Sequence, residues 1–236
     1  MRRSPEQYDW EGLLFDETFL DLHYSPRPHK DLKFVVVHHM MVVGNGDGRA
    51  NDACFNIWQT REASAHYGVD GRFVRQFVND TDYAWATGNT FGNEHGISIE
   101  HANTTLAPNY EVSDETIQTG ARLVAHLHKA YNLGRPVDGV TLKQHRNFFG
   151  TACPGPTLGE HRWPEYVATA QRIYDEITGG APLPPPPEPP RTHLVQRGDT
   201  LSGIARKYGT TWQRLQELNR LANPNVIRPG MNLLVR

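Results

Sequence analysis

The sequence predicts an α/β fold with a central mixed β-sheet flanked by helices, followed by a small module of two strands and two helices (βααβ). Short apolar, β-branched runs such as residues 34–37 (FVVV) are typical of buried strands. Stretches with helical periodicity, residues 114–131 and 164–177, follow the strands. A proline-rich run at residues 179–190 then sets the end of the chain apart. Strands mixed with helices indicate a sheet covered by helices.

A β-hairpin and a further strand are predicted in the middle of the first unit. Residues 65–69 and 72–78 flank Asp70-Gly71, which is a strong two-residue hairpin signal because both turn positions favour positive φ. Residues 96–100 (GISIE) alternate apolar and polar side chains, which predicts another strand.

Two helices have recognisable ends. Ser113 is a predicted N-cap, and the helix after it stops at residues 132–134 (NLG). The last helix of the first unit carries Pro164 in its first turn and ends at Gly179.

The 236 residues are enough for one sizeable core and a small second module. We expect an N-terminal extension at 1–29, a main domain at 30–178, a linker at 179–191 and a second domain at 192–236. The linker has no face that could pack, so it is predicted to be an extended, polyproline-like spacer. A binding site for a partner's proline-reading domain is the alternative.

The formal net charge of −2 argues against a general nucleic-acid binder. Residues 192–236 nevertheless carry +5, and the rest of the chain carries −7. A basic module on an acidic body favours attraction to a polyanionic surface, such as a wall that bears teichoic acid. The alternative is that these basic residues only form a solvated surface and bind no partner.

Only two cysteines, Cys54 and Cys153, are present, so this is not a disulfide scaffold and we expect reduced thiols, although counting alone leaves a single bridge open. The first residues lack the apolar run of a signal peptide. No stretch approaches the roughly 20 apolar residues of a membrane span. We therefore expect synthesis in the cytoplasm without a signal peptide and no membrane insertion.

Three potential metal ligands stand where the backbone would hold them: His38 at the end of a buried strand, His145, and Cys153 eight residues later. Two imidazoles and one thiolate form a typical three-ligand catalytic zinc shell, with a fourth position left for water. Strand periodicity does not choose between His38 and His39, because residues 35–37 are apolar on both faces. Each residue alone could equally be structural.

Residues 144–155 (QHRNFFGTACPG) closely resemble the second zinc motif of the N-acetylmuramoyl-L-alanine amidases that are related to phage lysozyme-amidases and to peptidoglycan recognition proteins. Residues 34–39 resemble the first zinc motif of that family, in which the first His of the pair is the ligand. Residues 64–71 resemble its hairpin and residues 96–100 its glutamate-bearing strand. The resemblance covers roughly residues 30–177 and implies an amidase-like fold there.

The resemblance implies a Zn²⁺ ion held by His38, His145 and Cys153, with Glu100 as the general base. A carboxylate beside a cation can take a proton from water and deliver it to the leaving nitrogen. Thr151 corresponds to a position that steadies the oxyanion, and a local backbone cap is the alternative role for its hydroxyl.

Three residues are predicted to bind substrate: His66, Tyr67 and Trp85. Some relatives place a catalytic Tyr on the hairpin where this chain has Ala65, so Glu100 is the preferred base. Many relatives also read Trp-His-Ala-Gly where residues 85–88 read Trp-Ala-Thr-Gly. These departures affect the contacts to substrate, not the zinc shell.

Residues 192–236 look like a LysM domain. The residues themselves predict a short strand, a Gly-Asp-Thr helix entry, two brief amphipathic helices and a closing strand. The resemblance implies a shallow groove that binds glycans containing N-acetylglucosamine through Gly198, Asp199, Thr200, Asn225, Val226 and Ile227.

The predicted function is hydrolysis of the amide bond between N-acetylmuramic acid and L-alanine in bacterial peptidoglycan. Two alternatives are a non-catalytic peptidoglycan-binding protein and a cysteine peptidase that uses Cys153 and His145 on peptide stems. Relatives that only bind typically lack a zinc ligand, whereas all three are present here. Cys153 precedes Pro154-Gly155 instead of starting a helix, which disfavours it as a nucleophile.

With a wall-binding module and no signal peptide, the chain resembles a phage endolysin. We expect a monomer that reaches the bacterial wall after release, through a pore formed by a phage holin.

Overall fold

The computed structural model describes residues 14–28, 31–179, 192–219, 221 and 223–235. The chain divides into two compact units between residues 184 and 185. This division falls within the predicted linker, whose residues 180–191 lie outside the described part. Each unit is described by itself.

A six-stranded mixed sheet forms the centre of the first unit, with the order β1-β5-β4-β7-β3-β8. The strands β4, β7, β3 and β8 run parallel to one another, and β4 and β5 form the predicted antiparallel hairpin, with Gly71 and Arg72 as its turn residues instead of Asp70 and Gly71. The strands are β1 (Leu14–Glu17), β3 (Phe34–Val43), β4 (Tyr67–Asp70), β5 (Phe73–Gln76), β7 (Gly96–Asn103) and β8 (Leu142–Gln144). A separate antiparallel pair consists of β2 (Tyr24–Pro26) and β6 (Asp82–Ala84).

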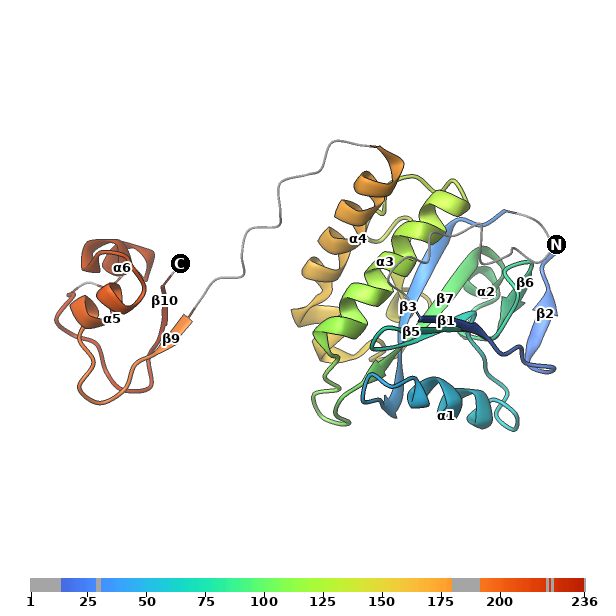
Figure 1. Ribbon diagram of the computed structural model, residues 1–236, viewed down its shortest axis with the longest axis horizontal. Coiled ribbons are helices and arrows are strands. Elements are labelled where there is room, and N and C mark those ends of the chain that lie inside the picture. Colours follow the sequence, from blue (N-terminus) through green and yellow to red (C-terminus); the bar gives the residue numbers. More distant parts are fainter. Residues whose placement is uncertain (1–13, 29–30, 180–191, 220, 222, 236) are drawn as a thin grey trace. The chain divides into compact units, whose positions relative to one another are not determined.

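Helices cover both faces of this sheet (Figure 1). The helices α3 (Asp114–Ala130) and α4 (Trp163–Thr178) pack side by side on one face, and α1 (Arg49–Ile57) packs against β3 and β4 on the other. The short helix α2 (Thr90–His95) leads directly into β7. Two short turns, a 3₁₀ turn at His145–Asn147 and a π turn at Thr157–His161, connect β8 to α4.

The predicted helix ends are confirmed by their caps. The Ser113 hydroxyl accepts a hydrogen bond from the Thr116 N–H at 3.1 Å, which satisfies one of the free donors of the first turn of α3. Pro164 lies in the first turn of α4, and Gly179 adopts the left-handed conformation at its end, with φ of 76°.

The main core lies between the sheet and the pair α3–α4. It contains Val35 and Val37 from β3, Ile97 and Ile99 from β7, and the apolar side of α3. A second cluster on the other face packs α1, including Cys54, against Met40 and Phe77. Because side chains alternate along a strand, the residues between the main-core positions point to the α1 face.

The sequence missed some short elements, among them β1 in the predicted N-terminal extension. This strand pairs in parallel with β5 at the edge of the main sheet, and Phe15 packs against the main core. Most of its residues are exposed, so its pattern carries no hydrophobic alternation. The strand β3 also continues past His38 and His39 to Val43, with an irregularity near Met41, whose φ is 54°.

The second unit has the predicted βααβ arrangement. The strands β9 (Thr192–Leu194) and β10 (Asn232–Leu234) pair antiparallel and enclose α5 (Leu201–Lys207) and α6 (Trp212–Leu218). Thr200 and Thr211 cap the two helices with their hydroxyls. Its core is small and apolar, and it contains Val195, Leu201, Ile204, Ala205, Leu215, Leu233 and Val235.

We predict that Gly120→Ala destabilises the first unit. Alanine normally stabilises the interior of a helix by about 1 kcal/mol relative to glycine. Here a Cβ would lie 2.2 Å from Nε2 of His101, which is hydrogen-bonded to the Tyr166 hydroxyl between the sheet and α4. Overpacking at this point should lower the free energy of unfolding by about 1–3 kcal/mol in urea titrations. Gln118→Ala, exposed on the same helix, is the control, and a stabilised Gly120→Ala protein would contradict the prediction.

Candidate active site

The pairing of β3 with β7 places His38 and Glu100 next to each other. The two strands are parallel, and His38 lies directly opposite Glu100 in the register. Val37 and Ile99, one residue earlier in each strand, belong to the core beneath α3 and α4. His38 and Glu100 therefore point together to the other face of the sheet.

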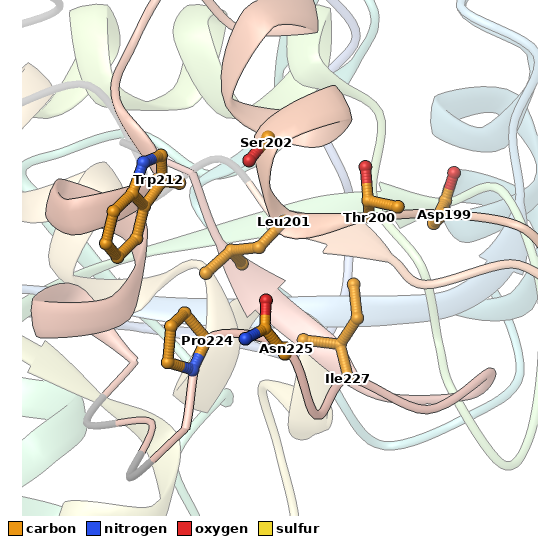
Figure 2. A pocket seen from close by; sticks show the side chains of 8 residues that line it. All are labelled: Asp199, Thr200, Leu201, Ser202, Trp212, Pro224, Asn225 and Ile227. Carbon is orange, nitrogen blue, oxygen red and sulfur yellow. The ribbon is translucent and has the colours of Figure 1, made fainter.

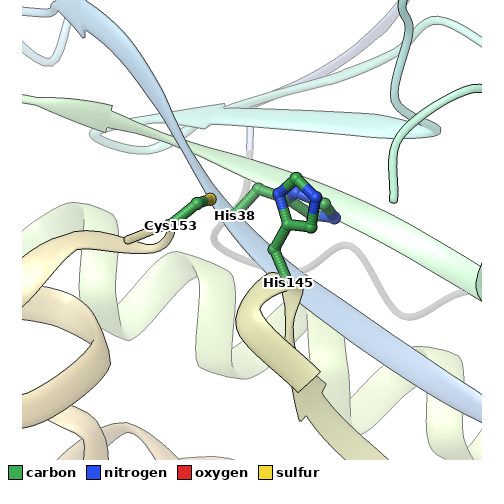
Figure 3. A group of neighbouring side chains, drawn as sticks. All are labelled: His38, His145 and Cys153. Atoms are coloured by element: carbon green, nitrogen blue, oxygen red, sulfur yellow. The ribbon is translucent and has the colours of Figure 1, made fainter. Parts of the chain in front are cut away.

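The site contains a possible metal-binding group formed by His38, His145 and Cys153 (Figure 3). One ligand atom from each residue lies within 4.8 Å of the other two. His145 follows β8 directly, and β8 pairs with β3 so that Val37 faces Gln144. The imidazoles of His38 and His145 consequently face each other, with ring centroids 4.5 Å apart.

Cys153 lies in the loop that follows, and backbone hydrogen bonds hold this loop in place. The Arg146 N–H donates to the Cys153 carbonyl at 3.2 Å, and the Arg146 guanidinium donates to the Ala152 carbonyl at 2.8 Å. The Cys153 sulfur accepts a hydrogen bond from the His39 N–H at 3.4 Å. Both cysteines are free thiols, as expected.

The structure distinguishes His38 from His39, which strand periodicity could not do. The His39 ring lies edge-on to Tyr110, with centroids 4.8 Å apart, and its side chain hydrogen-bonds to Asn103. Only His38 of the pair lies in the group with His145 and Cys153.

The donor atoms fit a divalent cation such as zinc. Among the described residues, the Nε2 atoms of His38 and His145 are buried without a hydrogen-bond partner. Burial lowers the pKa of His38 well below its usual value and also lowers the pKa of His145, so both imidazoles are neutral and can bind a metal. Burial and the nearby Glu100 carboxylate raise the pKa of the Cys153 thiol. A bound cation would favour the thiolate, whereas a thiol with a raised pKa is a poor free nucleophile.

Glu100 is a buried carboxyl group that lies beside the metal-binding group. Its Oε2 atom is buried and has no hydrogen-bond partner in the described part of the chain. Burial raises the pKa of Glu100 to about 8, and the positive charge of Arg61 opposes this shift. A carboxyl group with a pKa near the working pH can both accept and return a proton.

Thr151 lies two residues before Cys153, and its hydroxyl oxygen accepts a hydrogen bond from the Cys153 N–H at 3.2 Å. This is the local capping role that was the alternative to oxyanion contact. Because the hydroxyl uses a lone pair here, its own hydrogen is still available to donate.

The three predicted substrate-binding residues occupy different environments. Trp85 is 37% exposed, and its indole N–H donates to the Ser25 hydroxyl. His66 is buried, accepts the Ser98 N–H on its Nδ1 atom at 3.0 Å and lies against Arg27. Trp85 is thus accessible from solvent and His66 is enclosed by the protein, and substrate contact by these two residues stays a prediction.

Tyr67 requires a correction. Its side chain is 0% exposed, belongs to the core beneath α3 and α4, and donates its hydroxyl to the Asp80 carboxylate at 2.9 Å. It points away from His38, because the α3–α4 face is the opposite face of the sheet. The prediction that Tyr67 contacts substrate fails on this placement, and we do not retain it.

The second unit has a groove between its helix entry and the segment before β10 (Figure 2). Four predicted glycan-binding residues line it: Asp199, Thr200, Asn225 and Ile227. The sequence missed Leu201, Ser202, Trp212 and Pro224. Gly198 and Val226 are exposed neighbours that do not line the groove. Trp212 is 39% exposed, which for so large a side chain is a sign of a binding surface.

Sequence reasoning also missed the loop that contacts His145. The His145 imidazole hydrogen-bonds to the backbone of Thr87, in the segment that departs from the family pattern. Nothing in the periodicity of residues 85–88 indicates this contact, since it joins segments almost sixty residues apart.

The buried Glu100 carboxyl predicts a pH-dependent stability of the metal-free protein. Its folded pKa of about 8 exceeds the ordinary value of 4.5 for a glutamic acid, so the folded state retains a proton that the unfolded state loses between these pH values. Stability from this group is therefore complete below about pH 4.5 and declines as pH rises towards 8. In chelator, Glu100→Gln should gain stability relative to the unmodified chain between pH 5 and pH 8. The free energy of unfolding of the unmodified chain should fall relative to that of Glu100→Gln by up to about 1.4 kcal/mol per pH unit in this range. Urea titrations at several pH values measure this, and parallel curves for the two proteins would contradict it.

No helix in the described part of the chain is long and apolar enough to span a membrane.

Comparisons with known proteins agree with this architecture. The family model for N-acetylmuramoyl-L-alanine amidase matches residues 28–156, and the LysM domain model matches residues 193–236. The N-acetylmuramoyl-L-alanine amidase XlyB of Bacillus subtilis is 30% identical over 204 residues, which are 84% of this chain and 60% of that protein. The chain thus spans about 60% of the length of this relative.

Two solved structures share the fold. The Staphylococcus aureus hydrolase AmiA, solved with its ligand, has a TM-score of 0.56 at 18% identity, covering 72% of this chain and 87% of that one. A mutant endolysin from Bacillus subtilis has a TM-score of 0.53 at 18% identity, covering 67% and 99%. The chain belongs to the N-acetylmuramoyl-L-alanine amidase family and carries a LysM domain at its C-terminal end.

Proposed function

We propose that this protein hydrolyses the amide bond between N-acetylmuramic acid and L-alanine in bacterial peptidoglycan, with a zinc ion held by His38, His145 and Cys153. One observation carries the proposal. Two neutral imidazoles and a thiol place ligand atoms within 4.8 Å of one another, beside the buried carboxyl group of Glu100. Family membership supports the same reaction.

Zinc in such a shell supplies Lewis acidity, which lowers the pKa of a water molecule to near neutrality. Glu100 accepts the proton of the attacking water as a C–O bond forms at the amide carbonyl. The same carboxyl group returns the proton to the L-alanine nitrogen as the C–N bond breaks. Thr151 donates its hydroxyl hydrogen to the carbonyl oxygen while negative charge develops there.

We further propose that the LysM domain holds the enzyme on the wall by binding glycans that contain N-acetylglucosamine. Asp199, Thr200, Ser202 and Asn225 offer polar groups for N-acetyl and hydroxyl recognition, and Trp212 offers an apolar face for a sugar ring. A tethered weak binder raises the local concentration of the catalytic unit on the wall.

In this proposal the protein acts as an endolysin that lyses a bacterial host after release through a holin pore. The fold shared with a solved endolysin and the wall-binding domain support this role. The alternatives are a peptidoglycan-binding protein without activity and a cysteine peptidase, and product analysis distinguishes all three.

We predict that purified protein releases new L-alanine amino termini from cell walls without new reducing sugar ends, as measured by mass spectrometry.

Cys153→Ser should lose zinc and activity together. Glu100→Gln should retain zinc but lose about 10²–10⁴-fold in rate, because only the proton transfer is removed. Cys54→Ala is the matched control, since Cys54 is the other free thiol and packs in the α1 cluster. Full activity in a strong chelator, or in Cys153→Ser, would refute the zinc mechanism.

We also predict that deleting residues 181–236 weakens wall binding and lysis of intact walls but spares hydrolysis of small soluble fragments. The deletion begins beyond Gly179, the last described residue of the first unit, and so leaves all residues of the main core in the chain. Pull-down with purified walls and turbidity assays measure the two effects. Within the full chain, Trp212→Ala should reproduce the binding defect, and unchanged binding in both proteins would exclude a role for the groove.

A further inference from the structure

One side chain, that of Asn93, accepts three of the hydrogen bonds that hold the loop that contacts His145. Oδ1 of Asn93, on α2, accepts hydrogen bonds from the Thr87 N–H at 2.8 Å, the Thr87 hydroxyl at 2.7 Å and the Ala86 N–H at 3.3 Å. Thr87 is fully buried. Buried backbone N–H groups need hydrogen-bond acceptors, and residues 85–88 form no strand or helix that would supply such acceptors.

The same loop reaches the metal-binding group through the backbone of Thr87. The Thr87 N–H is used by Asn93, so the group that His145 contacts is the Thr87 carbonyl. An imidazole that donates one N–H to a carbonyl has its tautomer and ring plane fixed, which leaves the other nitrogen free to bind a metal. Asn93 itself belongs to neither the metal-binding group nor its sequence motifs.

We propose that Asn93 is a positioning residue of the metal centre. Its amide oxygen holds residues 86 and 87 so that the Thr87 carbonyl orients His145 for the metal. This inference rests on the proposed function, because it requires that His145 binds zinc. According to this inference, metal affinity also depends on Asn93, a residue that does not itself bind the metal.

Asparagine suits this task because its oxygen is an acceptor at the end of a short, stiff side chain. The backbone of Asn93 is itself held by α2, where its N–H donates to the Asn89 carbonyl at 2.9 Å. Packing adds to the constraint: a Cβ on Gly92 would lie 2.5 Å from the Thr87 hydroxyl oxygen and 2.9 Å from the Phe148 ring. The 85–88 loop, α2 and the segment after His145 are thus in close contact.

Three variants of the full chain separate positioning from general stability. Asn93→Ala removes all three acceptor contacts, and Asn93→Asp keeps an oxygen in the same place. Asn89→Ala is the matched control, because the Asn89 side chain caps the same short helix by accepting the Gly92 N–H at 3.0 Å but does not contact residues 86 and 87 with its side-chain oxygen. All three proteins are first tested for folding by circular dichroism and thermal unfolding.

Zinc affinity, measured by competition with a coloured chelator, is the main readout. We expect Asn93→Ala to weaken zinc binding by about 10–100-fold, the range typical for loss of a group that orients a metal ligand. Asn93→Asp should bind zinc nearly as the unmodified chain does, and Asn89→Ala should lower the unfolding temperature without changing zinc affinity. The cobalt-substituted Asn93→Ala protein should also show a changed visible spectrum, which reports ligand geometry independently of activity.

Two results would overturn the inference: equal zinc affinity in folded Asn93→Ala and the unmodified chain, or an equal loss of affinity in all three variants. Failure of the proposed function looks different, because the unmodified chain would then not bind one zinc ion per molecule.

Discussion

The parallel register between β3 and β7 is the constraint on which the site depends. It pairs His38 with Glu100 and puts both on the face opposite α3 and α4. A shift of the register by one residue in either strand would move His38 or Glu100 to the opposite face of the sheet, where it would point into the main core. His101 illustrates this alternation, because it follows Glu100 directly and yet forms a hydrogen bond with the hydroxyl group of Tyr166 on α4, on the opposite face of the sheet. The apolar pairs Val35–Ile97 and Val37–Ile99 bury the α3–α4 face and so fix the register that the polar pair requires.

His145, the second imidazole of the metal-binding group, follows the carboxyl end of β8, the neighbour of β3 on its other side. Since Val37 faces Gln144, His38 in β3 and His145 directly after the end of β8 come together. The loop beyond His145 then returns to the end of β3, where the His39 N–H meets the Cys153 sulfur. The register of the strands thus positions the two imidazoles of the metal-binding group, and a loop held by Arg146 positions the Cys153 thiol.

The sequence predicted the elements whose patterns are local. The hairpin near Asp70-Gly71, the Ser113 cap and the stop at Gly179 depend on a few adjacent residues, and the structure confirms these elements. The hairpin turn itself is shifted by one residue, because Asp70 pairs with Phe73 and leaves Gly71 and Arg72 in the turn, where only Gly71 has a positive φ. The choice between His38 and His39 depends on a strand about 100 residues away, so periodicity could not make it. Tyr67 was misplaced for a related reason: the hairpin lies in a sheet covered on both faces, where each Tyr67 neighbour is buried as well. The contact between Thr87 and His145 joins two irregular segments, and no local pattern encodes it.

Unsatisfied polar atoms give the strongest physical reason to connect this geometry with a cation. A buried donor or acceptor without a partner costs about 1–3 kcal/mol, and the Nε2 atoms of His38 and His145 and Oε2 of Glu100 bear this cost within one site. Glu100 also raises the pKa of the Cys153 thiol, so carboxylate and thiolate repel each other as long as no positive charge lies between them. A divalent ion would remove both penalties, because it attracts the thiolate and the carboxylate and occupies the free imidazole nitrogens. A bound cation would thereby regain the stability that the metal-free fold loses, and its binding would be coupled to folding of the sheet that carries the site.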